Sequence, residues 1–370
     1  MVYRGEELSL SGKINWFIER MGMWGDGKAI INHKGFYTYS AILRALNSKT
    51  WKLIPPSSEY NPEWLYGVLQ MKNPKVTVTT SGTTGKPKQI NISIADTLEK
   101  YKDKVPTPYQ MIAFLLFNHV GGINTLFRSL ASGGTLIIPK THSVSDVCRA
   151  IEEHKANCLP TTPSFLNMLL MSSAHIHYDL SSLRVISFGT EVMPEETMKR
   201  LLVAFPNVRF AHTYGTTELG VLETQTNKDN PLLIKVKGGF ADRGHLWVRH
   251  KNQLIDTGDL VDEHPDGWLR IKGRDTDIIN VGGEKIHPLE LEEMFLGMNE
   301  VDDVVVWGEG NPLMGQIVCA KFNLNMEYTS FEWKKILYDR MKGVDPYMRP
   351  VKVTVTSNPL YSDRGKKVRH

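Results

Sequence analysis

Residues 76–88 read VTVTTSGTTGKPK, and they set the expectation for the rest of the chain. The β-branched residues at the start of this stretch predict a strand, and a loop rich in hydroxyl groups and glycine follows directly. Glycines let a backbone approach an anion, hydroxyl and amide groups donate to phosphate oxygens, and lysines neutralise charge. The loop is not a Walker A sequence, because only two residues separate its glycines and a proline follows its first lysine. A phosphate-binding loop is therefore favoured over a polar surface turn, and a P-loop NTPase is disfavoured.

Strand and helix signals alternate after this loop. Apolar residues recur at the spacing of one helix face at Ile123, Leu126, Phe127 and Leu130. Further strands are expected at 135–139, 183–188 and 208–211, and further helices at 146–154, from 163 and at 194–204. This order predicts an α/β fold with a mostly parallel sheet.

The pattern changes near residue 275. A short helix is expected from Pro288, and a second one up to Met341 after the capping-box spacing of Thr329 and Glu332. Strands are expected at 304–307, 316–322 and 350–356. We therefore expect a large N-terminal α/β domain over residues 1–274 and a small, mobile α+β domain over residues 275–370.

Composition and charge narrow the class of protein. Hydrophobic residues make up 41% and charged residues 23% of the 370 residues, as in globular proteins. The formal charge of +4 is too small to predict nucleic-acid binding. The longest apolar run, 111–117, is too short to cross a bilayer, and the first residues lack the apolar core of a signal peptide. Three cysteines without metal-ligand spacing fit a reducing cytosol, so a cytoplasmic enzyme without a membrane or nucleic-acid partner is expected.

Four further segments carry groups suited to nucleotide chemistry. Residues 214–218 (YGTTE) offer a ring that can stack on a base, a threonine for phosphate and a carboxylate for Mg²⁺. Residues 257–259 (TGD) place a carboxylate after a tight turn, where it can accept from both ribose hydroxyls. Residues 273–292 join charged residues, a strand, a Gly-Gly loop and a helix that starts with proline, and residues 363–370 form a basic tail. Taken alone, each also fits an ordinary turn or a solvated end.

In this order the segments resemble the adenylate-forming superfamily, which holds acyl- and aryl-CoA synthetases, adenylation domains of nonribosomal peptide synthetases, and beetle luciferases. The resemblance rests on the loop 81–88 together with YGTTE, TGD, the Gly-Arg-x-x-Asp of 273–277 and the terminal Gly365-Lys366. It extends from about residue 25 to the end. It implies that a small carboxylic acid is activated with ATP and Mg²⁺ as acyl-AMP, with release of pyrophosphate, and is then passed to a thiol.

The resemblance also implies a nucleotide site. The β- and γ-phosphates would lie against Thr80, Ser81, Gly82, Thr83, Thr84, Gly85 and Lys88. The adenine would stack on Tyr214, close to Gly189, Thr190, His212 and Gly215. Asp259 would take the ribose hydroxyls with Arg274 beside it, and Thr217 would contact the α-phosphate. Glu218 would bind Mg²⁺, with Thr84 nearby.

The same resemblance assigns the catalytic lysine and the moving parts. Lys366 would bridge the carboxylate and the α-phosphate in the transition state, together with Thr217 and Glu218. It is preferred over the neighbouring Lys367 because it directly follows the glycine. The acid pocket would include His119, Phe188 and Gly189, with a structural role as the alternative for His119. The hinge would be Thr276, where relatives usually carry Asp or Lys, and the thiol tunnel would be lined by Gly282 and Gly283.

Several alternatives stay open. The thiol acceptor is CoA or the phosphopantetheine arm of an acyl carrier protein, the latter as in secondary metabolite biosynthesis. His119 favours an aryl or short acyl acid. An inactive acyl- or nucleotide-binding relative, direct transfer of the adenylate to an amine, and a luciferase-like oxygenase are the competing functions. The chain is shorter than typical relatives, so its N-terminal domain is expected to be trimmed, and a homodimer is one way to cover the apolar surface left exposed.

Overall fold

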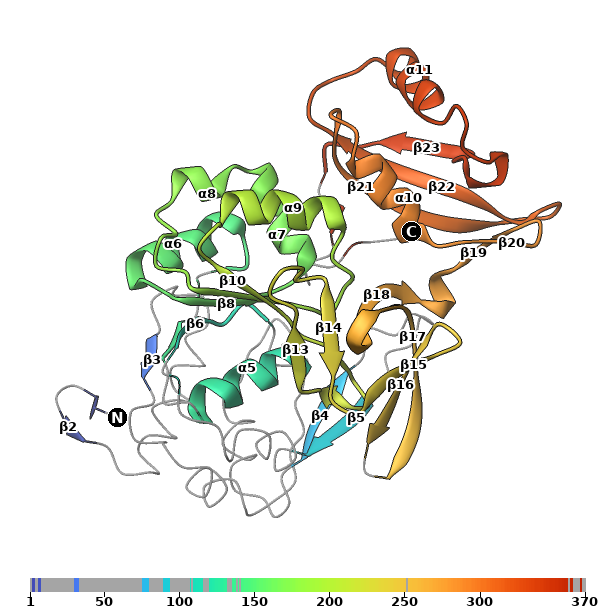
Figure 1. The fold of residues 1–370 in the computed structure, drawn as a ribbon. Coiled ribbons are helices and arrows are strands. Elements are labelled where there is room, and N and C mark those ends of the chain that lie inside the picture. The colour runs from blue at the N-terminus through green and yellow to red at the C-terminus, as the bar shows by residue number, and fades with distance from the viewer. Residues whose placement is uncertain are drawn as a thin grey trace. The chain divides into compact units, whose positions relative to one another are not determined.

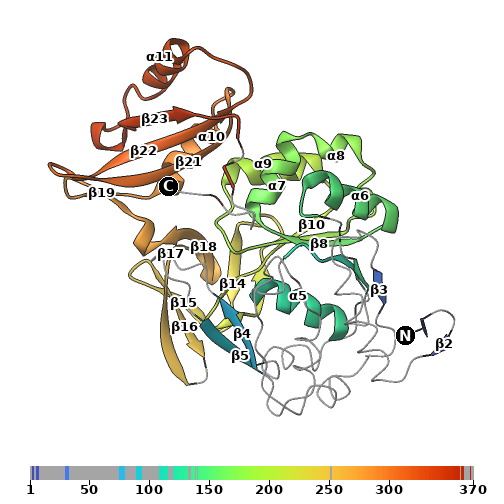
Figure 2. The ribbon, with the colours of Figure 1, turned by 180° about the vertical axis from the view of Figure 1, so that it is seen from behind.

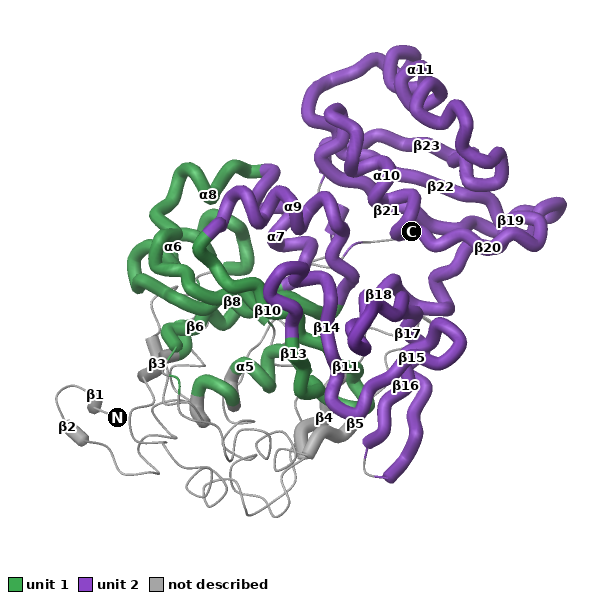
Figure 3. Tube along the Cα trace, in the orientation of Figure 1, with its two compact units in different colours: residues 1–161, 172–190, 207–225 green, residues 162–171, 191–206, 226–370 purple. Residues whose placement is uncertain are grey.

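The computed structural model describes most of the chain from residue 107 onward (Figure 1). Apart from the backbone of five short strands near the N-terminus, the described residues are 107, 109–115, 120–131, 135–137, 139, 141–250, 252–358, 360, 361 and 367. The short strands are β1 (Val2–Tyr3), β2 (Glu6–Glu7), β3 (Ile30–Asn32), β4 (Lys75–Thr79) and β5 (Gln89–Ser93). The chain forms two compact units, one of residues 1–161, 172–190 and 207–225 and the other of residues 162–171, 191–206 and 226–370 (Figure 3). A domain boundary after Arg274 stays a prediction.

The strand expected before the glycine-rich loop is present as β4. It pairs antiparallel with β5, from Lys75 opposite Ser93 to Thr79 opposite Gln89. The loop that joins the two strands, residues 80–88, lies outside the described residues.

A six-stranded sheet forms the centre of the first unit. Its order is β10-β9-β8-β6-β7-β3. Its remaining strands are β6 (Gln110–Ile112), β7 (Thr135–Ile137), β8 (Cys158–Thr161), β9 (Val185–Phe188) and β10 (Arg209–His212). All neighbours from β10 to β7 are parallel, and β3 joins β7 antiparallel. The residues of β8 and β9 are all buried, as expected for central parallel strands, so the predicted α/β fold with a mostly parallel sheet is confirmed.

Helices cover both faces of this sheet. They are α5 (Val120–Ala131), α6 (Val144–His154) and the short α8 (Ala174–His177). In both views α5 lies on one side of the sheet, and α6 and α8 lie on the other (Figures 1 and 2). The Ser143 hydroxyl caps α6 by accepting from the amide of Asp146, and Lys155 ends the helix in the left-handed conformation. The sequence thus determines where α6 starts and stops.

The second unit begins with two helices and most of an antiparallel sheet, and it also includes the last hundred residues. The helices are α7 (Pro163–Met171) and α9 (Glu195–Ala204). The sheet has the order β13-β14-β18-β17-β16-β15, with β13 (Thr224–Thr226), β14 (Leu233–Val236), β15 (Gly239–Asp242), β16 (His245–His250), β17 (Gln253–His264) and β18 (Trp268–Arg274). The sequence analysis assigned no strands here, because buried positions of β17 hold polar residues, Thr257 and Asp259, so the burial pattern does not show as an apolar pattern in the sequence. The TGD segment, expected as a tight turn, lies inside β17, where Gly258 has φ of 70°.

An arginine ties three elements of this unit together. Arg270 of β18 contacts Glu195 at the start of α9 at 3.0 Å and Glu293 at 2.6 Å. Glu293 belongs to α10 (Pro288–Leu296). The hydrogen bond from Arg270 lowers the pKa of Glu195, with a further hydrogen bond from Lys199. The ion pairs join the antiparallel sheet to both helices.

The last hundred residues build a layer of strands and helices around an aromatic core. The strands are β19 (Ile279–Val281), β20 (Glu284–Ile286), β21 (Val301–Asn311), β22 (Gly315–Leu324) and β23 (Lys352–Val355), and the second helix is α11 (Ser330–Arg340). The capping box expected at Thr329 and Glu332 starts α11. Phe322 contacts both Phe295 and Trp333 edge-on, with ring centroids 5.0 and 4.9 Å apart. No helix among the described residues combines the length and the apolar character that a membrane span requires.

We expect Trp333→Ala to lower the free energy of unfolding by roughly 3–5 kcal/mol, because it empties the centre of this core. Trp333 is 2% exposed, whereas Phe331 on the same helix is 78% exposed. Phe331→Ala is therefore the matched control and should change stability little. Thermal unfolding followed by circular dichroism compares the two, and equal midpoints would contradict the packing described.

Candidate functional site

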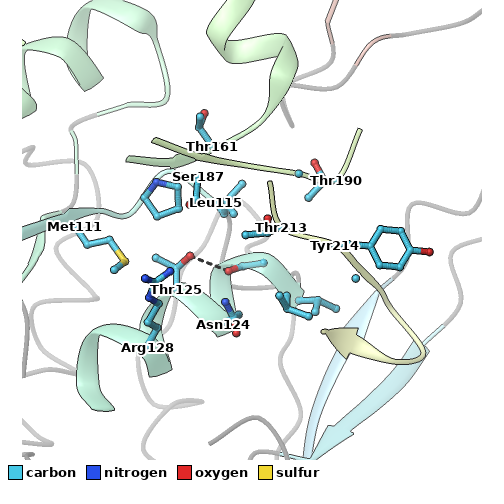
Figure 4. Close-up of a pocket in the computed structure, with 16 residues that line it drawn as sticks. Met111, Leu115, Asn124, Thr125, Arg128, Thr161, Ser187, Thr190, Thr213 and Tyr214 are labelled. Carbon is cyan, nitrogen blue, oxygen red and sulfur yellow. Dashed lines mark hydrogen bonds between the residues drawn. The ribbon is translucent and has the colours of Figure 1, made fainter. Parts of the chain in front are cut away.

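A pocket lies at the carboxyl ends of the central parallel strands in the first unit (Figure 4). One wall comes from α5, and the other comes from the residues that end or follow β8, β9 and β10, among them Thr161, Gly189, Thr190 and Tyr214. Open α/β sheets bind ligands at this edge, because the loops that follow the strands diverge there. The position makes this pocket the candidate site.

The turn after β9 and the turn after β10 are locked together. Thr213 donates twice to the carbonyl oxygen of Phe188, from its backbone amide at 2.8 Å and from its hydroxyl at 3.0 Å. A Cβ at Gly189 would lie 2.4 Å from the carbonyl oxygen of Thr213, so only glycine fits there. Thr190 follows with φ of 71°, a conformation that costs energy for a β-branched residue and is typical of functional sites.

The segment after β10 forms a small hairpin. Its strands β11 (Gly215–Thr216) and β12 (Gly220–Val221) pair antiparallel. The amide of Leu219 donates to the Thr216 hydroxyl at 3.1 Å and closes the turn. Tyr214 is buried and lines the pocket, whereas Glu218 lies on the turn and is exposed. The hairpin therefore leaves the carboxylate of Glu218 accessible to solvent.

Two predicted site residues form part of the sheet end. His212 stacks on Phe188, with ring centroids 4.7 Å apart and an angle of 25° between the rings. Both are buried, and neither side chain is among the described residues that line the pocket. Their assignment to adenine and to the acid stays a prediction.

In the second unit, Asp259 is held by its neighbour across the strands. Its carboxylate contacts the Nε atom of Arg274 at 2.7 Å, and the two residues are paired in β17 and β18. Arg274 also donates to the carbonyl oxygen of Thr257 at 3.0 Å. The Thr257 hydroxyl accepts from the amide of Asp259 at 3.2 Å. A carboxylate that is fixed in this way has a defined direction in which to accept hydroxyl hydrogens.

The predicted hinge and tunnel residues lie near the start of the last sheet. Thr276 is exposed in a short 3₁₀ turn, Asp275–Asp277. Gly282 and Gly283 form the exposed turn between β19 and β20, with φ values of 63° and 98° that favour glycine. Three other predicted parts lie outside the described residues: the loop 80–88, His119 and Lys366.

Lys367, next to the predicted catalytic lysine, is held by acceptors within the second unit. Its Nζ atom lies 2.6 Å from the carbonyl oxygen of Val304 and 3.0 Å from the carboxylate of Asp303. Glu292 is 3.8 Å away, and the Lys367 side chain is only 14% exposed. The backbone amide of Lys367 donates to Glu191 at 3.0 Å. These contacts identify Lys367 as an anchor of the C-terminal segment.

Asp303 receives a second donor from the same segment. The Tyr361 hydroxyl donates to it and accepts from the side-chain amide of Asn167 in α7 at 3.2 Å. Burial, and then the charge of Asp303, raise the pKa of Tyr361 well above its usual value. The hydroxyl therefore stays protonated and remains a donor.

The sequence analysis missed the residues that α5 contributes to the pocket. Gly121, Asn124, Thr125 and Arg128 follow the spacing of one helix face and all line it. By helical spacing, these four positions lie on the side of α5 opposite the apolar positions from which the helix was predicted. The signal available in the sequence was this row of small and polar residues on one side of a helix whose other side is apolar.

Among the described residues, the predicted ligand for Mg²⁺ is the carboxylate of Glu218. Among them, no group of three or more His, Cys, Asp or Glu side chains gathers to hold a metal. Mg²⁺ is usually held by one or two carboxylates together with phosphate oxygens, so the accessible Glu218 suffices in principle.

We expect Gly189→Ala to destabilise the protein by about 1–3 kcal/mol, because the new methyl group would force the two turns apart. A Cβ at Gly310 in β21 would meet no other part of the chain within 4 Å, so Gly310→Ala is the control. Chemical denaturation of both variants measures the difference. Equal midpoints would show that the turns separate without cost.

We expect Lys367→Met to cost on the order of 3 kcal/mol, since it removes the ammonium group that contacts two buried carboxylates. Asp303 and Glu292 are 1% and 2% exposed. Lys342, in an exposed ion pair with Asp339, provides the control Lys342→Met, which should change little. An unchanged unfolding midpoint for Lys367→Met would show that the contacts of Lys367 do not stabilise the protein.

Sequence comparison finds relatives among ligases. The chain is 23% identical over 335 residues to an indoleacetate–CoA ligase of Aromatoleum aromaticum, covering 78% of this chain and 62% of the relative. It is 26% identical to acyl-CoA synthetase 7 of Caenorhabditis elegans, covering 70% and 58%. It is 25% identical to 4-coumarate–CoA ligase-like 6 of Oryza sativa, covering 68% and 48%. The chain thus spans about half to three-fifths of the length of these relatives.

Solved structures confirm the fold. The amide bond synthetase McbA from Marinactinospora thermotolerans aligns with a TM-score of 0.65 at 20% identity, over 80% of this chain and 67% of that one. The anthranilate CoA ligase AuaEII, solved with anthranoyl-AMP, gives a TM-score of 0.63 at 17% identity, over 82% and 69%. A family profile described as AMP-binding enzyme matches residues 43–242. The chain belongs to this family of AMP-binding enzymes, within the adenylate-forming superfamily.

Proposed function

We propose that the protein uses ATP to convert a small carboxylic acid into an acyl-AMP, releases pyrophosphate, and passes the acyl group to a thiol. The observation that carries the proposal is the pocket at the carboxyl ends of β8, β9 and β10, where Gly189 and Tyr214 line the wall. Gly189 contributes no side chain to this wall, and the neighbouring ring of Tyr214 can stack on a planar base. Family membership and the ligases among the relatives support the same activity.

The protein contributes positioning and charge to this reaction. The acid carboxylate attacks the α-phosphorus and pyrophosphate leaves in line, so the reactants must be aligned and the developing charge spread. In this proposal Tyr214 holds the adenine, Asp259 accepts from the ribose hydroxyls, and Thr217 donates to the α-phosphate. Lys366 stabilises the charge that develops between the carboxylate and the phosphate. Mg²⁺, when bound at Glu218, neutralises the phosphates.

The acid is proposed to be an aryl or a short acyl acid. The end of the pocket away from Tyr214 carries the side chains of Met111 and Arg128 (Figure 4). Such long side chains restrict the room for an extended alkyl chain. Three similar proteins are consistent with an aryl acid: the indoleacetate–CoA ligase, the 4-coumarate–CoA ligase-like protein and the anthranilate CoA ligase of similar fold.

CoA is the proposed acceptor, since the named relatives are CoA ligases. The carrier-protein phosphopantetheine arm is the alternative, and it uses the same thiol chemistry. For this second step, residues 275–370 are proposed to rotate about Thr276 and to bring Gly282 and Gly283 to the thiol. The rotation would move Lys366 away from the site where the adenylate forms and bring the thiol tunnel to that site.

Acid-dependent release of pyrophosphate tests the proposal. A panel of aryl, short-chain, long-chain and amino acids is supplied with Mg-ATP, each with and without CoA. Release with one class of acid and formation of its CoA thioester are the expected results. Adenylate without thioester would indicate a carrier protein or an amine as acceptor. No release with any acid, in protein that binds ATP, would favour an inactive binding relative.

We expect Lys366→Ala to reduce adenylate formation by about 10²–10³-fold, as found when a transition-state donor is removed. The fold and the affinity for ATP should be nearly unchanged. Lys342→Ala, which removes an exposed lysine, serves as the control. Normal pyrophosphate release by the Lys366 variant would refute the assignment.

A further inference from the structure

A serine faces the pocket from the middle of the parallel sheet. Ser187 lies in β9 and lines the pocket, whereas its neighbours along the strand, Ile186 and Phe188, are not among the described residues that line it. Successive side chains of a strand point to opposite faces of the sheet, so the Ser187 side chain is directed to the face on which the pocket lies. Figure 4 shows Ser187 among the lining residues.

The sheet offers the hydroxyl of Ser187 no partner. Ser187 is paired with Pro160 of β8 on one side and with Ala211 of β10 on the other, and neither of these side chains carries a polar group. Among the residues that the structure describes, none forms a hydrogen bond with the Ser187 hydroxyl, and only 5% of the residue is exposed. A hydroxyl that is buried without a partner costs free energy, which a hydrogen bond from a ligand would recover.

The buried threonines of the pocket differ from Ser187 in this respect. The Thr125 hydroxyl donates to the carbonyl oxygen of Gly121 at 2.9 Å, a bond within α5. The hydroxyl of the half-buried Thr213 donates to the carbonyl oxygen of Phe188 at 3.0 Å. Thr161 is paired with Phe188, so by the same alternation its side chain belongs to the opposite face of the sheet. Ser187 thus combines a direction toward the pocket with a hydroxyl that the described residues leave available.

The chemistry of the wall defines which group of a ligand can meet this hydroxyl. Met111, Leu115 and Pro160 line the same pocket and are apolar. A polar group of the ligand that is buried against such side chains loses its hydration, and a hydrogen bond to Ser187 offsets the loss. A serine hydroxyl carries no charge and can both donate and accept, so it suits a hydroxyl or an amino group.

The strand sets how far this group lies from the reacting end of the acid. Ser187 precedes Gly189 by two residues, which is about 7 Å along a strand. In the proposed function Gly189 lies beside the adenylate. One aromatic ring, or a short chain, is long enough to join a carboxylate at Gly189 to a polar group at Ser187.

We infer that the acid carries a hydroxyl or amino group at the end away from its activated carboxylate, and that Ser187 binds this group. The inference rests on the proposed function and narrows the substrate class for the same pocket. The competing explanation is that Ser187 only fills space between Pro160 and Ala211.

Matched pairs of acids test the inference in the wild-type protein. In each pair a methyl group replaces the hydroxyl or amino group at nearly equal size: 4-hydroxybenzoate or 4-aminobenzoate against 4-methylbenzoate, 3-hydroxybenzoate against 3-methylbenzoate, and 5-hydroxypentanoate against hexanoate. We expect kcat/KM for acid-dependent pyrophosphate release to be at least about fivefold higher for the polar acid of one pair. Equal or higher values for the methyl-bearing acid in every pair would overturn the inference, while any acid-dependent release leaves the proposed function standing.

A variant without the hydroxyl separates recognition from packing. Ser187→Ala should lower kcat/KM for the preferred polar acid by about 5- to 10-fold, mainly through KM, and leave its methyl-bearing partner within about twofold. The same variant without any acid should keep the unfolding temperature of the wild-type protein or raise it, because the hydroxyl has no partner among the described residues. Ser357→Ala, at an exposed position of the second unit, is the matched control.

The outcomes are distinguishable. An equal loss for both acids of a pair, together with a lower unfolding temperature, would assign Ser187 a packing role and overturn the inference. If Ser187→Ala does not fold, the ratios in the wild-type protein decide. No release with any acid of the larger panel would instead count against the proposed function. In that case the Kd values of the same pairs, measured by calorimetry in the presence of ATP, decide whether Ser187 selects a polar acid.

Discussion

Two hydrogen bonds from Thr213 to the last carbonyl oxygen of β9 determine the shape of the candidate site. They draw the turn after β10 over Gly189, where no side chain fits. The hairpin that begins at Tyr214 starts from this fixed point, so the direction of its ring and the accessibility of Glu218 depend on it. Without these two hydrogen bonds, β9 and β10 would still pair in the sheet. The turns that follow them, however, would not be held together in the wall of the pocket.

The sequence predicted the parallel sheet well, because fully buried strands and amphipathic helices leave strong periodic signals. The strand β9 and the capped helices α6 and α11 lie close to where these signals place them, whereas the short strand β8 was not assigned. The antiparallel sheet around β17 was missed. The buried positions of its longest strand include the polar residues Thr257 and Asp259, with Gly258 between them, so no apolar pattern marks that strand in the sequence.

The site was predictable where a motif is local and not where it depends on tertiary structure. The glycine after β9 and the pairing of Asp259 with Arg274 lie within short segments that the sequence analysis had singled out. Arg128 lies on a helix predicted for its apolar face, and its place in the pocket depends on three strands from distant parts of the sequence. Lys367 was considered only as a neighbour of Lys366, because Asp303 and Glu292 are far away in the sequence.

The anchoring of Lys367 has a consequence for the order of folding during synthesis. Asp303 and Glu292 leave the ribosome well before the lysine that neutralises them is translated. Until then, burial of Asp303 lacks its contact with the Lys367 ammonium, which raises the cost of burying that carboxylate. The region where α10 meets β21 therefore completes its packing only after the C-terminal segment has emerged. The packing of this region is thus coupled to the synthesis of Lys367, more than sixty residues after Asp303.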